Sequence, residues 1–207
     1  IKMKILPTIG PVTQDTSKLK TIFKYSKIVR LNASHNEIGW HKNIIKKIKK
    51  LNSDIDILLD IPGIKPRTDN KKIIYVKKNQ IIRFAYKNSL RTNYISTTKP
   101  LPKSNKKNKY FSVDDGKLIF KIIKSSKNIL IGKALDNYQI HPKKGINVPL
   151  SIYNNEEQKK NFFKYLNYFK KSNFNLVGLS FVQNHKLIIF LKKKYPHLLF
   201  VSKIENS

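Results

Sequence analysis

The sequence predicts an α/β protein in which an antiparallel β module interrupts a parallel sheet, and three observations predict this. In the first 60 residues, strand-like and helix-like segments alternate, which favours right-handed crossovers between parallel strands. Between residues 72 and 148, short β-rich stretches are separated by polar turns, as antiparallel strands are. From residue 155 onward the strand and helix alternation returns.

The first part of the chain contains three predicted strands and two predicted helices. In order they are strand 4–9, helix 17–25, strand 27–32, helix 40–51 and strand 56–60. The strands are short apolar runs, and Gly10-Pro11 ends the first of them. The helices show apolar residues at helical spacing, for example Ile44, Ile45 and Ile48.

The last part of the chain repeats this alternation after the β module. Its predicted elements are helix 155–171, strand 176–181, helix 184–194 and strand 199–204. Five parallel strands with intervening helices are typical of the start of a TIM (β/α)8 barrel, which usually needs about 250 residues. Removing the module of about 77 residues leaves about 130, which suits five of eight units.

We therefore expect a partial TIM barrel with an inserted small antiparallel β-barrel domain. Residues 1–68 are expected to form the first barrel part with strands 1–3, and residues 69–148 the inserted domain. Residues 149–207 are expected to form the second, truncated barrel part with strands 4–5. The barrel is unfinished and the chain does not begin with methionine, so the chain is expected to be either a fragment or a natural truncation.

Composition excludes several classes of protein. The chain has no cysteine, which excludes disulfide scaffolds, thiolate metal sites and cysteine nucleophiles. It has neither an apolar run of about 18 to 20 residues nor a signal peptide, so we expect a cytoplasmic protein without a membrane partner.

The formal net charge of +31 raises the question of a nucleic-acid partner. Specific nucleic-acid binders use arginine freely, because its planar fork binds phosphate and guanine through two donors. Of the 43 basic residues here, the arginines are only Arg30, Arg67, Arg83 and Arg91. The lysines are spread along the whole chain, so we do not expect a nucleic-acid partner, although the positive field attracts anionic metabolites.

Polar side chains stand at the carboxyl ends of three predicted strands, where such barrels carry their functional groups. They are Arg30, Asn32 and Ser34 in the second strand, Asp60 in the third, and Lys203 and Glu205 in the fifth. Within a strand, alternate residues face the same side, so each set converges. Structural roles remain open as alternatives. An ion pair can link Arg30 to Asp60, Asn32 and Ser34 can cap the next helix, and Lys203 and Glu205 can form a solvated pair.

A series of short motifs runs through the whole chain in order. They are Thr8-Ile9-Gly10-Pro11, Arg30-Leu31-Asn32-Ala33-Ser34-His35, Asp60 with Gly63 and Arg67-Thr68, Val113-Asp114-Asp115-Gly116, Lys143-Lys144-Gly145-Ile146-Asn147-Val148-Pro149, Ser180-Phe181-Val182 and Lys203-Ile204-Glu205-Asn206. Each motif alone is weak, but the set in this order and spacing resembles the pyruvate kinase family. The resemblance implies the first five units of that catalytic barrel and its inserted B domain.

The resemblance also implies a reaction and its residues. The family transfers a phosphoryl group between phosphoenolpyruvate and ADP, giving pyruvate and ATP in glycolysis, with Mg²⁺ or Mn²⁺ and usually K⁺, and a full-length chain is expected to form a homo-oligomer. By this resemblance the catalytic residues are Arg30, Arg67 and Lys203, and Arg30 and Lys203 also bind the substrate. The nucleotide-binding residues are Pro11, His35 and Lys144. The potassium ligands are Asn32, Ser34, Asp60 and the carbonyl of Ile61, and the magnesium ligand is Glu205.

Some positions depart from the family pattern. Ile61 stands where a threonine is usual, residues 62–67 differ from the common segment, and the second carboxylate ligand of the metal falls beyond Ser207. We therefore expect the 207-residue chain alone to be inactive. The alternative is a degenerate homologue that binds a phosphorylated ligand or a nucleotide without kinase turnover.

Overall fold

The computed structural model describes residues 5–86, 94–105, 107–126, 128–151 and 155–205. The chain divides into two compact units. The first unit consists of Ile1–Gly63 and Asn155–Glu205, and the second contains Ile64–Asn154. These divisions fall a few residues from the predicted domain bounds at 68 and 149, which stay a prediction.

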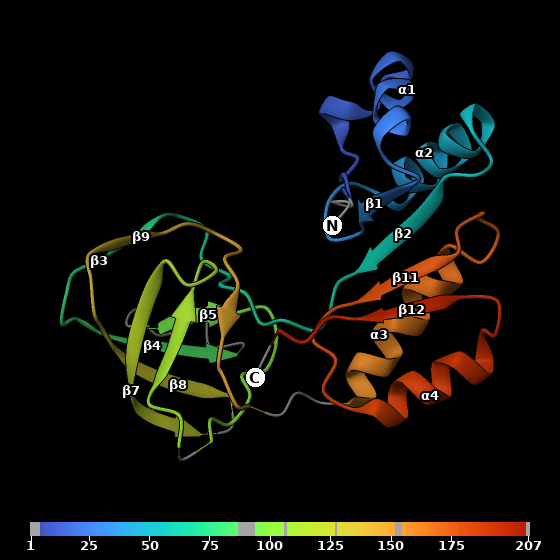
Figure 1. The fold of residues 1–207 in the computed structure, drawn as a ribbon. Helices are drawn as coiled ribbons and strands as arrows, with labels where there is room; N and C mark the ends of the chain where they lie inside the picture. Colours follow the sequence, from blue (N-terminus) through green and yellow to red (C-terminus); the bar gives the residue numbers. More distant parts are fainter. Residues whose placement is uncertain (1–4, 87–93, 106, 127, 152–154, 206–207) are drawn as a thin grey trace, which may run out of the picture. The chain divides into compact units, whose positions relative to one another are not determined.

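A parallel sheet forms the centre of the first unit (Figure 1). Its strands are β1 (Ile28–Asn32), β2 (Asp56–Ile61), β11 (Leu176–Leu179) and β12 (Leu199–Ser202), in that spatial order. Beside β1, Thr8 forms a parallel bridge with Arg30, and Ile9 N donates to Arg30 O at 2.9 Å. The predicted strand 4–9 is thus present as one bridge, and residue 4 lies outside the described residues. The sheet is curled like half of a barrel, and the first unit as a whole has mixed α/β content.

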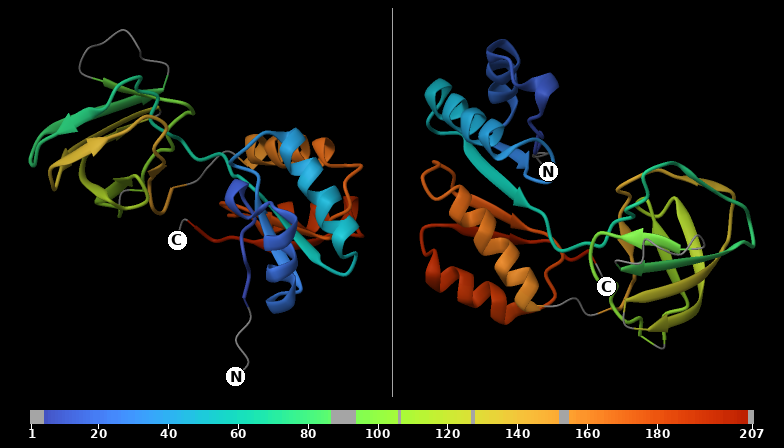
Figure 2. Two further views of the ribbon diagram at one scale, coloured as in Figure 1. Left: turned by 90° about the horizontal axis from the view of Figure 1, so that it is seen from above. Right: turned by 180° about the vertical axis from the view of Figure 1, so that it is seen from behind.

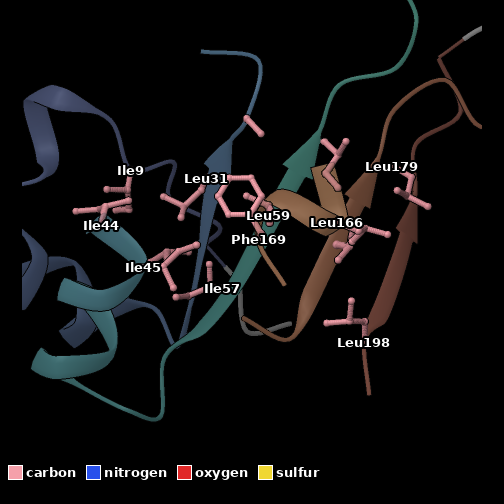
Figure 3. Close-up of a cluster of buried hydrophobic side chains, with 14 of the residues drawn as sticks. Ile9, Leu31, Ile44, Ile45, Ile57, Leu59, Leu166, Phe169, Leu179 and Leu198 are labelled. Atoms are coloured by element: carbon pink, nitrogen blue, oxygen red, sulfur yellow. The ribbon is translucent and has the colours of Figure 1, made fainter. Parts of the chain in front are cut away.

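Four helices pack on one face of this sheet. They are α1 (Thr16–Tyr25), α2 (Ile38–Leu51), α3 (Asn155–Tyr168) and α4 (His185–Lys194). One buried cluster joins Leu31, Leu59 and Leu179 of the strands to Ile45 and Leu166 of the helices (Figure 3). In Figure 2, α3 lies across β11 and β12. None of the helices described here is long and apolar enough to cross a membrane.

Several element bounds differ from the predicted ones; the strand predicted over 176–181, for example, ends at Leu179. The helix predicted over 155–171 ends at Tyr168, because the chain tightens into three-residue turns around the buried Phe169, with Ser172 N donating to Phe169 O at 2.8 Å. The strand predicted over 199–204 ends at Ser202. Lys203 N still donates to Leu179 O at 2.9 Å, so the ladder reaches one residue past the strand.

The opposite face of the sheet carries the polar residues. In a parallel sheet, paired residues point to the same side. The register pairs Asn32 with Asp60 and Asp60 with Gly178, and Gly178 with Val201. The side chains predicted at the strand ends therefore project on the side that the helices leave uncovered.

The second unit is built from β strands. A six-stranded sheet has the order β10 (Ile146–Asn147), β6 (Tyr110–Val113), β7 (Leu118–Ser126), β8 (Ile129–Ala134), β4 (Ile81–Tyr86) and β5 (Tyr94–Thr97), and β3 (Ile74–Val76) pairs with β9 (Tyr138–Ile140). All pairs are antiparallel except β4 with β5, which is parallel. The core stacks Phe111 on Phe120, with Phe84 edge-on to both.

Residues 66–69 connect the two edge strands of the six-stranded sheet. On one side, Thr98 N donates to Arg67 O at 2.9 Å beside β5. On the other side, Thr68 N donates to Lys144 O at 2.8 Å, and Ile146 N of β10 donates to Pro66 O at 2.8 Å. This seam closes the sheet upon itself, and it fixes the backbone of Arg67 and Lys144.

Candidate functional site

The carboxylate of Asp60 lies at the centre of the polar groups at the carboxyl end of the parallel sheet. Asp60 is only 3% exposed. The Arg30 guanidinium binds Asp60 Oδ2 through two donors, Nε at 2.8 Å and Nη2 at 2.7 Å. The Lys203 ammonium lies 3.1 Å from both carboxylate oxygens. A buried carboxylate thus stands between two cations, one from β1 and one from the segment after β12.

Two further groups contact the Lys203 ammonium. Ser180, the residue directly after β11, accepts a hydrogen bond from Lys203 Nζ at 2.9 Å. Glu205 Oε1 lies 3.6 Å from the same nitrogen. We call Arg30, Asp60, Ser180, Lys203 and Glu205 together the Asp60 cluster.

The chain after β11 turns sharply to reach Glu205. Phe181 has a φ of 57°, a left-handed conformation that bulky residues rarely adopt and that is often found at functional sites. In this conformation Phe181 N donates to Glu205 Oε2 at 2.9 Å. A Cβ at Gly63 would lie 2.7 Å from the carbonyl oxygen of Ser180, so the close approach at this turn requires glycine.

The formal charges of the Asp60 cluster cancel. Arg30 and Lys203 contribute two positive charges, and Asp60 and Glu205 contribute two negative charges. Arg30 and Lys203 keep side-chain exposures of 28% and 33%, whereas Asp60 is buried. An incoming phosphate therefore meets two accessible cations that a buried carboxylate holds in place, an arrangement that favours binding of a phosphoryl group.

The predicted potassium ligands lie at the ends of β1 and β2. They offer the amide oxygen of Asn32, the hydroxyl of Ser34, the carboxylate of Asp60 and the carbonyl of Ile61. Oxygen donors of this kind suit a hard cation. Asn32 Oδ1 accepts from Ser34 N at 3.1 Å and Ile61 O accepts from Ser180 N at 3.2 Å, and each carbonyl-type oxygen retains a second lone pair. By type these oxygens are donors that K⁺ accepts, while the Asp60 carboxylate oxygens already contact Arg30 and Lys203.

The predicted magnesium ligand is a single carboxylate. Glu205 has one oxygen bonded to Phe181 N and the other near Lys203. Within the described ranges, no group of three or more His, Cys, Asp or Glu side chains is arranged to hold a metal ion. Mg²⁺ usually takes one or two carboxylates together with phosphate oxygens and water. Glu205 fits that pattern as one ligand that needs oxygens from a phosphorylated substrate.

The predicted nucleotide contacts of the first unit lie on two exposed segments. Pro11 begins a short 3-10 helix, Pro11–Thr13, and is exposed. His35 lies between β1 and α2 and is also exposed, with its N donating to Asn32 O at 3.2 Å.

Lys144 and Arg67 belong to the second unit, where each has a defined partner. The Lys144 ammonium lies 3.0 Å from Asp114 Oδ1, and Tyr138 OH donates to Asp114 Oδ2 at 2.6 Å. The hydrogen bond to Asp114 raises the pKa of Tyr138 to about 12. Arg67 Nη1 donates to Lys143 O at 3.1 Å.

Of the predicted site residues, the structure brings Arg30, Asp60, Lys203 and Glu205 together. The ion pairs named as structural alternatives are also present, because Arg30 contacts Asp60 and Lys203 lies near Glu205. Asn32 and Ser34 do not cap α2, since Glu37 occupies its N-cap.

Two residues of these clusters were not predicted as site residues. Ser180 follows β11 directly, and its position at a strand end was the available signal. Asp114, like Ser180, stands in one of the short motifs of the sequence, and its contact with Lys144 depends on the closed β-sheet of the second unit.

A cavity of about 850 Å³ lies elsewhere in the first unit. It is lined by Phe169, Lys170, Tyr195 and Leu198 among others, at the ends where β11 and β12 begin. The Asp60 cluster lies at the other ends of these strands. Because functional groups of barrel-type proteins gather at the carboxyl ends, we place the candidate site at the Asp60 cluster.

The fold and the Asp60 cluster define an α/β protein with a curled half-barrel sheet and charged groups at the carboxyl ends of its parallel strands. A family model described as "Pyruvate kinase, barrel domain" matches residues 1–207. The chain therefore belongs to the pyruvate kinase family.

Curated relatives with the name pyruvate kinase cover most of the chain. The protein from Borreliella burgdorferi is 26% identical over 219 aligned residues, which cover 99% of this chain and 44% of that protein. The protein from Thermococcus litoralis is also 26% identical, over 99% of this chain and 46% of its own length. The protein from Buchnera aphidicola is 32% identical over 70% of this chain and 33% of its own length. The chain thus spans less than half the length of these relatives.

Proposed function

We propose that the protein to which this chain belongs is an active pyruvate kinase that transfers the phosphoryl group of phosphoenolpyruvate to ADP, giving pyruvate and ATP. The observation that carries the proposal is the Asp60 cluster, in which one cation from β1 and one from the segment after β12 flank a buried carboxylate. Family membership supports the same reaction. The reaction is a step of glycolysis, and its substrates are the partners that the proposal assigns.

In the proposed site, Arg30 and Lys203 are the catalytic cations. The transition state of phosphoryl transfer is loose, with negative charge spread over the transferred group, so fixed positive charges stabilise it without covalent chemistry. Asp60 orients both cations before substrate binds. Because the cations are already positioned, little reorganisation is needed when the charge develops.

The proposal includes two kinds of metal ion. Asn32, Ser34, Asp60 and the Ile61 carbonyl would hold K⁺, and Glu205 would hold Mg²⁺ or Mn²⁺ together with phosphate oxygens. Such ions supply positive charge next to the phosphoryl oxygens. Pro11, His35 and Lys144 are proposed to contact the nucleotide, and Arg67 is proposed as a further cation of the reaction.

The proposed architecture is a TIM barrel with an inserted β-barrel domain. The first unit provides its first five strands, and the second unit, with a closed sheet, is the insertion. The exposure of Leu199 (62%) and Val201 (42%) supports the barrel. These apolar residues lie on the face without helices, which is the face that a complete barrel buries.

The test is a lactate-dehydrogenase-coupled assay of the full-length protein with phosphoenolpyruvate, ADP, Mg²⁺ and K⁺. Lys203→Gln is expected to lower kcat by at least about a hundredfold, because one preorganised charge is removed from the site. Lys192→Gln, at an exposed position of α4, is the control and is expected to keep the wild-type rate. Absence of turnover by the wild-type protein would overturn the proposal.

A second candidate is a homologue that binds phosphorylated ligands without turnover. Ile61, which lacks the usual threonine hydroxyl, and the altered segment 62–67 favour it. In that case the full-length protein shifts its melting temperature with ADP or phosphoenolpyruvate, yet shows no rate in the coupled assay.

A further inference from the structure

We propose that Trp40 and His41, two neighbouring residues near the start of α2, are positioning residues for the nucleotide. They hold the two segments that carry Pro11 and His35. The inference rests on the proposed function, in which those two residues contact the nucleotide. Neither Trp40 nor His41 matched a site position in the sequence.

His41 holds the turn between β1 and α2. Its Nε2 lies 2.7 Å from the carbonyl oxygen of His35. Because a carbonyl only accepts hydrogen bonds, Nε2 carries the proton and donates. His41 is 2% exposed, and its buried Nδ1 has no hydrogen-bond partner among the residues that the structure describes. The ring is therefore neutral, with a single donor that points at the segment of His35.

The surroundings of the His41 ring keep this donor in place. The ring packs edge-on against Trp40, with centroids 4.9 Å apart, and against Phe169 at 6.1 Å. α2 itself is anchored in the core through Ile44, Ile45 and Ile48. This hydrogen bond is costly to break, because the buried imidazole N–H of His41 would lose its acceptor away from water.

Trp40 holds the other segment. Its indole Nε1 donates to Gln14 Oε1 at 2.8 Å. Lys47, two turns further along α2, donates to the backbone carbonyl of Gln14 at 2.7 Å. Gln14 is the C-cap of the 3-10 helix Pro11–Thr13, so both bonds fix the end of that helix.

One helix therefore sets the spacing of the two exposed segments that carry Pro11 and His35. Asn36, next to His35, has a φ of 59°, and the turn is not part of the sheet. Loops that are ordered before binding lose less conformational freedom on binding, which improves affinity. Loss of either anchor should weaken nucleotide binding and leave the Asp60 cluster, and with it phosphoenolpyruvate binding, unchanged.

The experiment measures dissociation constants of ADP and phosphoenolpyruvate by calorimetry, with the full-length protein and three variants. Trp40→Phe removes the indole donor and His41→Leu removes the imidazole donor. Each is expected to raise the Kd of ADP about five- to tenfold, the usual effect of one lost hydrogen bond. His41→Gln keeps an N–H donor at similar reach and is expected to stay near wild type. The Kd of phosphoenolpyruvate is expected to change less than about twofold in all three.

Hydrogen exchange provides a readout that does not depend on ligand. Residues 10–14 are expected to exchange faster in Trp40→Phe, and residues 33–37 in His41→Leu, with the β2 and β11 segments unchanged.

Each other outcome overturns the inference in a distinguishable way. If ADP binds the variants as it binds wild type, the positioning role is wrong and the proposed function stands. If phosphoenolpyruvate and ADP weaken equally, the variants damage the fold in general. If His41→Gln behaves as His41→Leu does, the donor is not the cause. If the wild-type protein binds neither ligand, the proposed function fails and this inference fails with it.

Discussion

At the scale of single residues, the candidate site depends on positions that permit close approach as much as on charged groups. Gly178 is one of them, because a Cβ there would lie 3.2 Å from Asp60 Oδ1. Gly63 is another, next to the strained Phe181. Small residues at these points let a buried carboxylate and a turn pack against neighbouring backbone, which a side chain would displace.

Gly63→Ala and Gly39→Ala are expected to change the free energy of unfolding in opposite directions. At Gly63 the new Cβ meets the Ser180 carbonyl at 2.7 Å, so overpacking should lower stability by about 1–3 kcal/mol. At Gly39, within α2, a Cβ meets nothing within 4 Å, and the better helix propensity of alanine should raise stability by up to about 1 kcal/mol. Urea unfolding of both variants checks this. Equal changes would show that the turn at Ser180 tolerates a side chain.

Burial of His41 is expected to make stability depend on pH. Desolvation lowers the pKa of His41 below its ordinary value of 6.5, so the folded state binds this proton less readily than the unfolded state. The contribution is present above pH 6.5 and is lost as the pH falls below it. Urea unfolding at pH 7.5 and 5.5 is expected to show a smaller loss of stability in His41→Gln than in wild type. The exposed His185→Gln is the control, and equal pH dependence of all three proteins would contradict the assignment.

At the scale of elements, the second unit depends on the seam formed by residues 66–69, a segment that has no strand pattern in the sequence. Thr68 is 0% exposed, its Oγ1 donates to His141 O at 3.2 Å, and it accepts from Lys144 N at 3.0 Å. Through these bonds residues 66–69 join β5 to β10. The seam also fixes the backbone of Lys144, the residue proposed to reach the nucleotide.

Thr68→Val is expected to destabilise the second unit by about 1–2 kcal/mol, because the shape is kept while a buried donor and acceptor lose their partner. Thr21→Val, at an exposed position of α1, is the matched control, with an expected change within about 0.5 kcal/mol. Hydrogen exchange of residues 143–146 distinguishes a local opening of the seam from a general loss of stability. Unchanged exchange there would contradict the role of the hydroxyl.

At the scale of the whole molecule, the dominant property is the formal net charge of +31. The 12 acidic residues can neutralise only a minority of the 43 basic side chains. In the part of the chain that the structure describes, Arg30 and Lys203 pair with the buried Asp60, whereas Lys18 and Lys143 form ion pairs at the surface. Net charge of this size destabilises the compact state through self-repulsion, which salt screens.

The melting temperature is therefore expected to rise by several degrees between about 10 mM and 300 mM NaCl, as the screening length falls from about 30 Å to less than 8 Å. A constant or falling melting temperature in NaCl would show that self-repulsion is not significant.

Much of the fold was predictable from local patterns. Apolar spacing gave the four helices of the first unit to within a few residues, and short apolar runs gave β1, β2, β11 and β12. The end of α3 at Tyr168 was missed, because buried Phe169 continues the apolar period while the backbone already turns. The spacing of apolar residues indicates which side chains are buried, but it does not indicate where the backbone hydrogen bonds of a helix end.

The amino-acid sequence by itself determined which residues are apolar or charged, their alternation along each strand, and hence that Arg30, Asp60 and Lys203 stand at strand ends. Only the tertiary structure decided that Arg30 and Lys203 share the carboxylate of Asp60, that Ser180 contacts Lys203, and that α2 holds the segments of Pro11 and His35. The physical reason is the sequence distance over which the interactions act. Side-chain alternation and helical period arise from bonds between near neighbours, whereas distances between residues 30 to 143 positions apart depend on how strands pair and how helices pack.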